Sequence, residues 1–171
     1  MANAKRMINL DKVQASYVGN IESVKWEDGQ LQNGTPIVLG ALATGESELY
    51  NILITGVTGA LATSEVLIVA SPEVMYRDDL MTSDFYVSTG AAARAYHMTI
   101  GDIFTISQVA SSVQSTAAVG DCIVMNATGM NFIVTAQTAA IAGWKFVAKV
   151  IELTTIGYDE DDAISVRVIS A

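Results

Sequence analysis

The segment AVGDCIVMNATGMNFIV, residues Ala118–Val134, decides how the sequence is interpreted, because it places the single cysteine of the chain beside a Gly-Asp pair. Cys122 is either part of a reactive site or the first residue of a strand that follows a turn. The pattern VGDCI at Val119–Ile123 has a parallel in IGDIF at Ile100–Phe104. In both, an apolar residue, glycine and aspartate precede two apolar residues. We interpret each as a turn in which glycine adopts a conformation costly for other residues, followed directly by a strand.

A looser version of the same pattern is NGTPIV at Asn33–Val38. Three such turns indicate a repeated structural device rather than repeated chemistry. Cys122 stands where Ile103 stands in the sister turn. It is therefore predicted to pack as a small hydrophobic residue.

The composition indicates a surface covered by other chains. The 171 residues suffice for one domain with a substantial core. Only 16% of them are charged and 51% are hydrophobic, whereas about 25% are charged in an ordinary soluble domain. A membrane would also explain this, but the longest charge-free run, Cys122–Trp144, is interrupted by polar residues and glycine, and a spanning helix needs about 20 mostly apolar residues. The start, MANAKRMINLDK, lacks the apolar segment of a secretory signal.

The charge balance argues against nucleic acid as a partner. The chain has 18 acidic and 9 basic residues and a net charge of −9. Such a chain repels phosphate backbones. One cysteine also means that no intramolecular disulfide can form.

Short runs rich in Val, Ile, Thr and aromatic residues alternate with Gly, Asn and Asp, which is typical of an all-β domain. We predict a mainly β fold, an antiparallel β-barrel or β-sandwich with at most one or two short helices. SPEVMYRDDLM at Ser71–Met81 is the best helix candidate. Residues 1–15 are predicted as a flexible N-terminal arm and residues 16–171 as a single β domain. The predicted strands are Ser16–Trp26, Pro36–Leu42, Leu49–Ile54, Glu65–Ala70, Arg94–Met98, Asp102–Val109, Cys122–Met125, Asn131–Thr135, Trp144–Leu153 and Ile164–Ser170.

The sequence contains no catalytic constellation that we can assign. A Cys122–His97 pair has no local signature, and His97 is the only histidine. One histidine and one cysteine exclude zinc sites of the His/Cys type. The acidic run Asp159–Asp162 lacks calcium-loop spacing and is predicted as a solvated turn, with an ion site as the alternative. We therefore predict a protein that is not an enzyme and has no catalytic, cofactor-binding or metal-binding residues and no cofactor.

Two weaker patterns have ordinary structural interpretations. Asn33 and Asn126 match the glycosylation motif but are predicted to lie in turns. Scattered aromatic residues could line a sugar-binding groove, although packing is their commoner use. They are Trp26, Trp144, Tyr76, Tyr86 and Tyr96.

Several segments resemble those of a family of small structural proteins of tailed bacteriophages, encoded among head genes and taken to be capsid decoration or cement proteins. The likeness extends in order and spacing over most of the chain after about Ser16. The segments are VASPEVMY (Val69–Tyr76), ARAY (Ala93–Tyr96), GDIF (Gly101–Phe104), VIELTTIG (Val150–Gly157) and VRVI (Val166–Ile169).

The resemblance implies a virion component that is made in the host cytoplasm, binds the outer face of an assembled capsid and stabilises it. The implied partners are the major capsid protein and further copies of the chain, with a trimer as one candidate state; nucleic acid and membrane are not expected. We expect the arm Met1–Gln14 to become ordered only on the capsid or against a neighbouring copy. The alternatives are a tail-tube or baseplate subunit, for which Gly40–Leu61 is the candidate extending hairpin, and a glycan-binding surface module.

Overall fold

The computed structural model describes residues 6–53, 63–74, 84–107, 117–126, 129–135, 143–157 and 161–171. Within these ranges the chain is mainly β, as the sequence predicts. Its elements, in chain order, are β1 (Ile8–Lys12), α1 (Gln14–Val18), β2 (Ile21–Lys25), β3 (Pro36–Leu42), β4 (Leu49–Leu53), β5 (Leu67–Val69), β6 (Ala92–His97), β7 (Ile103–Ser107), β8 (Cys122–Met125), β9 (Phe132–Thr135), β10 (Val147–Ile156) and β11 (Asp161–Ser170).

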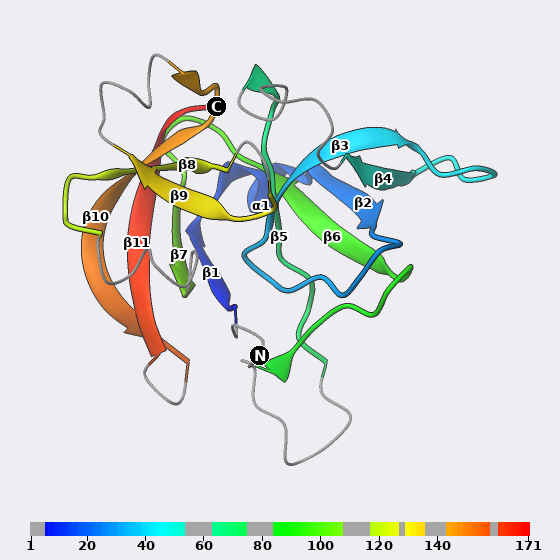
Figure 1. Ribbon diagram of the computed structural model, residues 1–171, viewed down its shortest axis with the longest axis horizontal. Coiled ribbons are helices and arrows are strands. Elements are labelled where there is room, and N and C mark those ends of the chain that lie inside the picture. Colours follow the sequence, from blue (N-terminus) through cyan, green and yellow to red (C-terminus); the bar gives the residue numbers. More distant parts are fainter. Residues whose placement is uncertain are drawn as a thin grey trace.

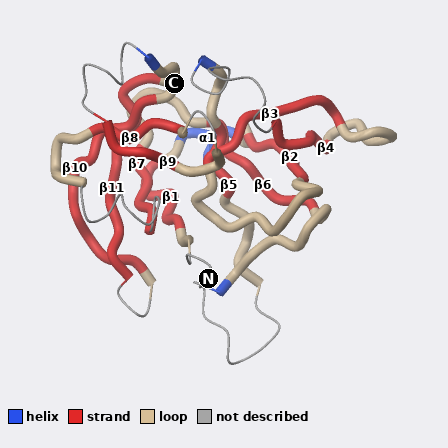
Figure 2. Tube along the Cα trace, in the orientation of Figure 1, coloured by secondary structure: helices blue, strands red, loops and turns tan. Residues whose placement is uncertain are grey.

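The strands form two sheets that lie side by side (Figures 1 and 2). One is a closed barrel in the order β2-β4-β3-β5-β6, and the other is a six-stranded sheet in the order β1-β7-β11-β10-β8-β9. Strands β2 and β4 run parallel, whereas the other named pairs are antiparallel. The predicted barrel is thus confirmed, with one parallel pair that the sequence did not indicate.

The short strand β5 belongs to both hydrophobic cores. Leu67 and Val69 face the barrel interior, where they pack in one apolar cluster. Ile68 points the other way and packs in the cluster shared with the six-stranded sheet. Successive side chains of a strand point to opposite faces, so a strand buried on both sides reads as a continuous apolar run. All three residues of β5 are buried.

The larger core is built around three phenylalanines: Phe104 of β7, Phe132 of β9 and Phe146, which directly precedes β10. The ring centroids of Phe104 and Phe132 are 6.5 Å apart, and those of Phe132 and Phe146 are 5.8 Å apart. Such tilted contacts add to the free energy gained by burying the rings. Val38 and Ile68 of the barrel pack in the same cluster. The barrel and the six-stranded sheet therefore share one core.

The two Gly-Asp turns have the same backbone hydrogen bonds, and the first connects β6 to β7. Gly101, at φ 98°, donates its N–H to the carbonyl of Val168 on β11. The N–H of Val168 donates back to the carbonyl of Asp102, and the N–H of Asp102 donates to the carbonyl of Thr99. The positive φ is a conformation that other residues adopt at a cost. The turn thereby joins the start of β7 to β11.

The second turn, before β8, repeats this arrangement on β10. Gly120 has φ 101° and donates to the carbonyl of Val150. Val150 donates to the carbonyl of Asp121, and Asp121 donates to Ala118. The interpretation of both segments as one repeated turn is confirmed.

The looser third copy precedes β3 and has the same backbone bonds. Gly34, at φ 79°, donates to Val69 on β5, and Val69 donates back to Thr35. Thr35 donates to the carbonyl of Gln32. A threonine here takes the position that aspartate holds in the other two turns.

The prediction of a flexible arm over residues 1–15 is wrong for residues 8–15. Residues 8–12 form β1, which pairs with β7, and Val13 and Ala15 are buried. The apolar side chains of Val13 and Ala15 pack in the larger core, and β1 pairs with the edge of β7 that β11 leaves unpaired. Residues 1–5 lie outside the described part of the chain.

The predicted strand Ser16–Trp26 is likewise corrected, because it begins only at Ile21. The residues before it belong to helix α1, whose buried side chain is Ala15. Gly19, in the left-handed conformation, ends the helix and donates its N–H to Ala15. The helix candidate Ser71–Met81 has no helix at 71–74, which lack regular secondary structure, and 75–81 lie outside the described residues.

The Asp102 side chain has a structural role that Asp121 lacks. Asp102 is only 4% exposed, and its carboxylate accepts the N–H groups of Thr99 at 2.8 Å and Gln14 at 3.0 Å. The Asp121 carboxylate is more accessible and accepts the N–H of Ala118 at 2.9 Å. Only the first carboxylate ties a turn to the segment that follows β1.

We expect Asp102→Ala to lower the free energy of unfolding by ~2–4 kcal/mol, because two N–H groups lose a buried charged acceptor. Asp121→Ala, the matched control in the sister turn, should cost ~1 kcal/mol. Urea unfolding followed by circular dichroism measures both. Equal losses in the two variants would contradict the assigned role of Asp102.

Candidate functional site

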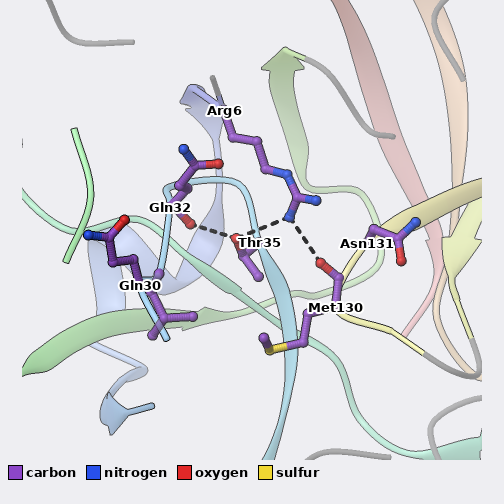
Figure 3. A pocket seen from close by; sticks show the side chains of 7 residues that line it. Arg6, Gln30, Gln32, Thr35, Met130 and Asn131 are labelled. Carbon is purple, nitrogen blue, oxygen red and sulfur yellow. Dashed lines mark hydrogen bonds between the residues drawn. The ribbon is translucent and has the colours of Figure 1, made fainter. Parts of the chain in front are cut away.

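A cavity of about 430 Å³ lies where the segment before β1 meets the turn before β3 and the β8–β9 connection (Figure 3). The Arg6 side chain enters it. Its Nη1 donates to the carbonyl of Met130 at 3.0 Å and to the Thr35 hydroxyl at 3.4 Å. The Thr35 hydroxyl in turn donates to the carbonyl of Gln32 at 2.7 Å. Burial lowers the pKa of the Arg6 guanidinium, which nevertheless stays charged at neutral pH.

The sequence prediction missed this cavity, because Arg6 was assigned to a flexible arm. A signal was nevertheless present in the third copy of the turn. Its threonine replaces the aspartate of the two other copies, and Thr35 is the residue that Arg6 reaches.

A second region, here called the Ile100 surface, consists of Lys12, Tyr17, Ile100, Ile151 and Arg167. These residues line two adjoining hollows of about 410 and 400 Å³, which have Ile100, Gly101 and Arg167 in common. Three of its side chains are apolar or aromatic and strongly exposed: Tyr17 is 80%, Ile100 72% and Ile151 41% exposed. Single exposed apolar residues are ordinary, but a group of them marks an interaction site.

The repeated turn explains why two of the exposed aliphatic residues lie where they do. Ile100 and Val119 each precede the turn glycine, and both are exposed, Val119 at 63%. Each glycine is bonded to a strand of the six-stranded sheet, so each turn is fixed beside β10 or β11. The repeated sequence pattern therefore also places an exposed aliphatic side chain before each turn glycine, which the sequence alone did not indicate.

Cys122 is completely buried in β8, as predicted from its position after the turn. It packs against Val124, Val147 and Trp144. Burial raises the pKa of the thiol above its ordinary value, with Lys149 opposing the rise and Asp121 adding to it. A neutral thiol inside an apolar cluster is a poor nucleophile.

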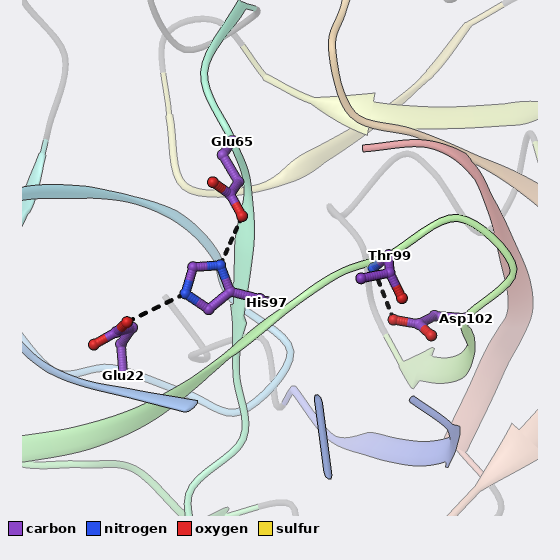
Figure 4. Close-up of polar contacts among 5 residues, drawn as sticks. All are labelled: Glu22, Glu65, His97, Thr99 and Asp102. Atoms are coloured by element: carbon purple, nitrogen blue, oxygen red, sulfur yellow. Dashed lines mark hydrogen bonds and ion pairs between the residues drawn. The ribbon is translucent and has the colours of Figure 1, made fainter. Parts of the chain in front are cut away.

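His97 lies in the barrel and not beside Cys122. Its Nδ1 is 2.6 Å from Oε1 of Glu65, and its Nε2 is 3.4 Å from Oε1 of Glu22 (Figure 4). The imidazole thus stands between the two carboxylates and links β2 to the segment before β5. The carboxylates approach opposite sides of the ring, which keeps them from sharing one metal ion.

Other residues considered from the sequence do not form a common site. Within the described ranges, no group of three His, Cys, Asp or Glu side chains could hold a metal ion. Of the acidic run Asp159–Asp162, residues 159 and 160 lie outside the described part, whereas Asp161 and Asp162 belong to β11 and not to a turn, and Asp162 pairs with Thr155 of β10. Asn33 is buried and bonded through its side chain to the backbone of Ser71.

The aromatic residues are distributed among different clusters. Trp26 packs against the barrel core, Tyr96 against the larger core, and Trp144 against β8, where its Nε1 donates to the carbonyl of Met125 at 2.9 Å. Tyr86 is exposed, and Tyr76 lies outside the described residues. The predicted packing role is confirmed for the three that are buried in part.

No protein-family model matches the chain, and comparisons with curated proteins and with solved structures also found no match. No helix within the described ranges has both the length and the apolar character required to cross a membrane. The candidate sites are therefore defined by the geometry of the chain itself.

We expect Cys122 to react with a thiol reagent such as dithionitrobenzoate at least ~100-fold more slowly in the native protein than in guanidinium, because the native thiol is neutral and enclosed. The chain has no other cysteine, so the absorbance reports this residue alone. Stoichiometric labelling of the native protein at the rate of the unfolded chain would contradict the assignment.

Proposed function

We propose that this protein is a virion structural protein that binds the outer surface of an assembled phage capsid and stabilises it. The observation on which this rests is the Ile100 surface, where exposed Tyr17, Ile100 and Ile151 lie together beside Lys12 and Arg167. Covering these side chains with a partner subunit removes apolar area from water. This contributes roughly 25 cal/mol per Å² before the costs of association.

The charges suit a protein surface as the partner. The chain has a net charge of −9, yet three of its nine basic residues, Lys12, Lys149 and Arg167, line the two hollows of this surface. Aromatic and arginine side chains are enriched at protein–protein interfaces, which have an apolar centre and a polar rim. Many copies bound to one shell further increase the effective affinity when each also contacts its neighbour. The proposal includes self-association as a homo-oligomer and the major capsid protein as the partner, and it agrees with the resemblance to phage head proteins.

The second candidate is a tail-tube or baseplate subunit, favoured by the hairpin of β3 and β4. Figure 1 shows this hairpin extending away from the six-stranded sheet. Its described part reaches from Gly40 to Leu53, and residues 54–61 of the predicted segment Gly40–Leu61 lie outside the described ranges. Light scattering separates the two functions, because a tube protein assembles into rings or tubes, and a decoration protein stays a monomer or small oligomer in solution.

The direct test adds the purified chain to phage heads assembled in its absence and then heats them. We expect the chain to bind and to raise the temperature at which the heads release DNA. The variant with Tyr17→Ser and Ile100→Ser should bind at least ~10-fold more weakly, because each large apolar side chain contributes about 1.5–3 kcal/mol when buried.

Leu42→Ser is the matched control, since Leu42 is also an exposed aliphatic residue but lies at the end of β3 on the barrel. It should bind like the natural chain. Equal binding by the control and the double variant would remove the Ile100 surface from the proposal. Absence of binding to the heads would refute the decoration function itself.

A further inference from the structure

We propose that the cavity at Arg6 is a binding site for a carboxylate group attached to a short apolar stem. The inference is independent of capsid binding, because the cavity shares no lining residue with the Ile100 surface. Four observations support it: an arginine without a carboxylate partner among the described residues, a turn that lacks the aspartate of its two sister turns, further amide groups, and apolar walls.

The first observation is the state of the guanidinium. The part of the chain that the structure describes contains 14 of the 18 acidic residues, and none of these forms an ion pair with Arg6. Only Nη1 donates to described groups, the carbonyl of Met130 and the hydroxyl of Thr35, and both acceptors are neutral. Nη2 and Nε remain available for an oxyanion. A partly buried charge is costly unless an opposite charge compensates it.

The second observation comes from the repeated turn. Asp102 and Asp121 follow their turn glycines, whereas Thr35 follows Gly34. The backbone bonds are otherwise alike. An aspartate at position 35 would place a carboxylate next to the guanidinium, because the threonine hydroxyl is already 3.4 Å from Nη1. The chain instead keeps a neutral residue there and leaves the positive charge for another partner.

The third observation is the group of amides around the cavity. The Gln30, Gln32 and Asn131 side chains line it together with Arg6 (Figure 3). The Oδ1 of Asn131 accepts the side-chain N–H of Asn126 at 3.1 Å, so its own Nδ2 is the group left to donate. Side-chain amides and a guanidinium are donors that match the oxygens of a carboxylate, which arginine binds in a bidentate manner.

The fourth observation decides between classes of anion. Arg6 is the single cation among the described residues that line the cavity, and the chain as a whole has a net charge of −9. A phosphate dianion would bring more negative charge than the site compensates, whereas a carboxylate brings one. Leu31 and Met130 form apolar walls, which suit a short aliphatic stem behind the charged group.

The carboxylate has two conceivable sources, a free short-chain acid and an acidic side chain of a protein partner. We would titrate the isotope-labelled full-length chain with sodium butyrate and, separately, with acetyl-glutamate amide, and follow backbone and arginine N–H resonances. Saturable shifts should appear at Arg6, Gln32 and Asn131, with Kd values in the millimolar range. Tighter binding of butyrate assigns the site to a free acid, and tighter binding of the glutamate derivative assigns it to a side chain; either result supports a carboxylate site.

The test variant is Arg6→Gln, with Arg94→Gln as the matched control on the exposed side of β6. We expect Arg6→Gln to weaken butyrate binding at least ~10-fold, because the charge-assisted bonds are lost. Arg94→Gln should bind like the natural chain. If Arg6→Gln does not fold, the shift pattern of the natural protein still tests the proposal.

Thr35→Asp provides a second, independent variant. The new carboxylate at position 35 should form an ion pair with the Arg6 guanidinium inside the cavity. The folded variant should therefore lose butyrate binding. Three outcomes would overturn the proposal: no saturable shifts up to roughly 50 mM ligand, equal butyrate binding by Arg6→Gln, or tighter binding of inorganic phosphate than of butyrate. None of these bears on head binding, which the heating experiment measures separately.

Discussion

Burial of β5 on both faces is the constraint on which the rest of the structure depends. Leu67 and Val69 complete the barrel interior, and Ile68 enters the core of the six-stranded sheet. Three consecutive residues thereby fix the position of one sheet against the other. A polar residue at any of them would leave an uncompensated group in one of the two cores, which is costly. The barrel and the six-stranded sheet for this reason share one hydrophobic core.

The repeated glycine turn connects this core to the strands around it. Two copies bond to β11 and β10, and the third bonds to Val69 at the end of β5. Each copy uses the same three backbone bonds, so side chains at equivalent positions are free to differ. The residue before glycine is an exposed aliphatic in two copies and the buried Asn33 in the third. The same turn geometry thus occurs with an exposed side chain before the glycine in two copies and with a buried one in the third.

These differences place both candidate binding regions. Ile100 extends from the first turn onto the surface proposed to meet a capsid. Thr35 of the third turn faces Arg6 and leaves that charge without a carboxylate among the described residues. The repeated sequence pattern predicted a recurring turn, and the backbone hydrogen bonds confirm that turn. The two candidate binding regions arise at the positions where the side chains of the three turns differ.

The sequence by itself determined the β class, most strands and the burial of Cys122, because alternation and turn residues are local properties. β3 and β8 have the predicted bounds, Pro36–Leu42 and Cys122–Met125. Only the tertiary structure decided that residues 8–12 form an edge strand, since that depends on the distant β7 for its partner. It also brought Arg6 to Thr35 and Met130, 29 and 124 residues away. Contacts over such separations depend on how the sheets pack, which local patterns do not encode.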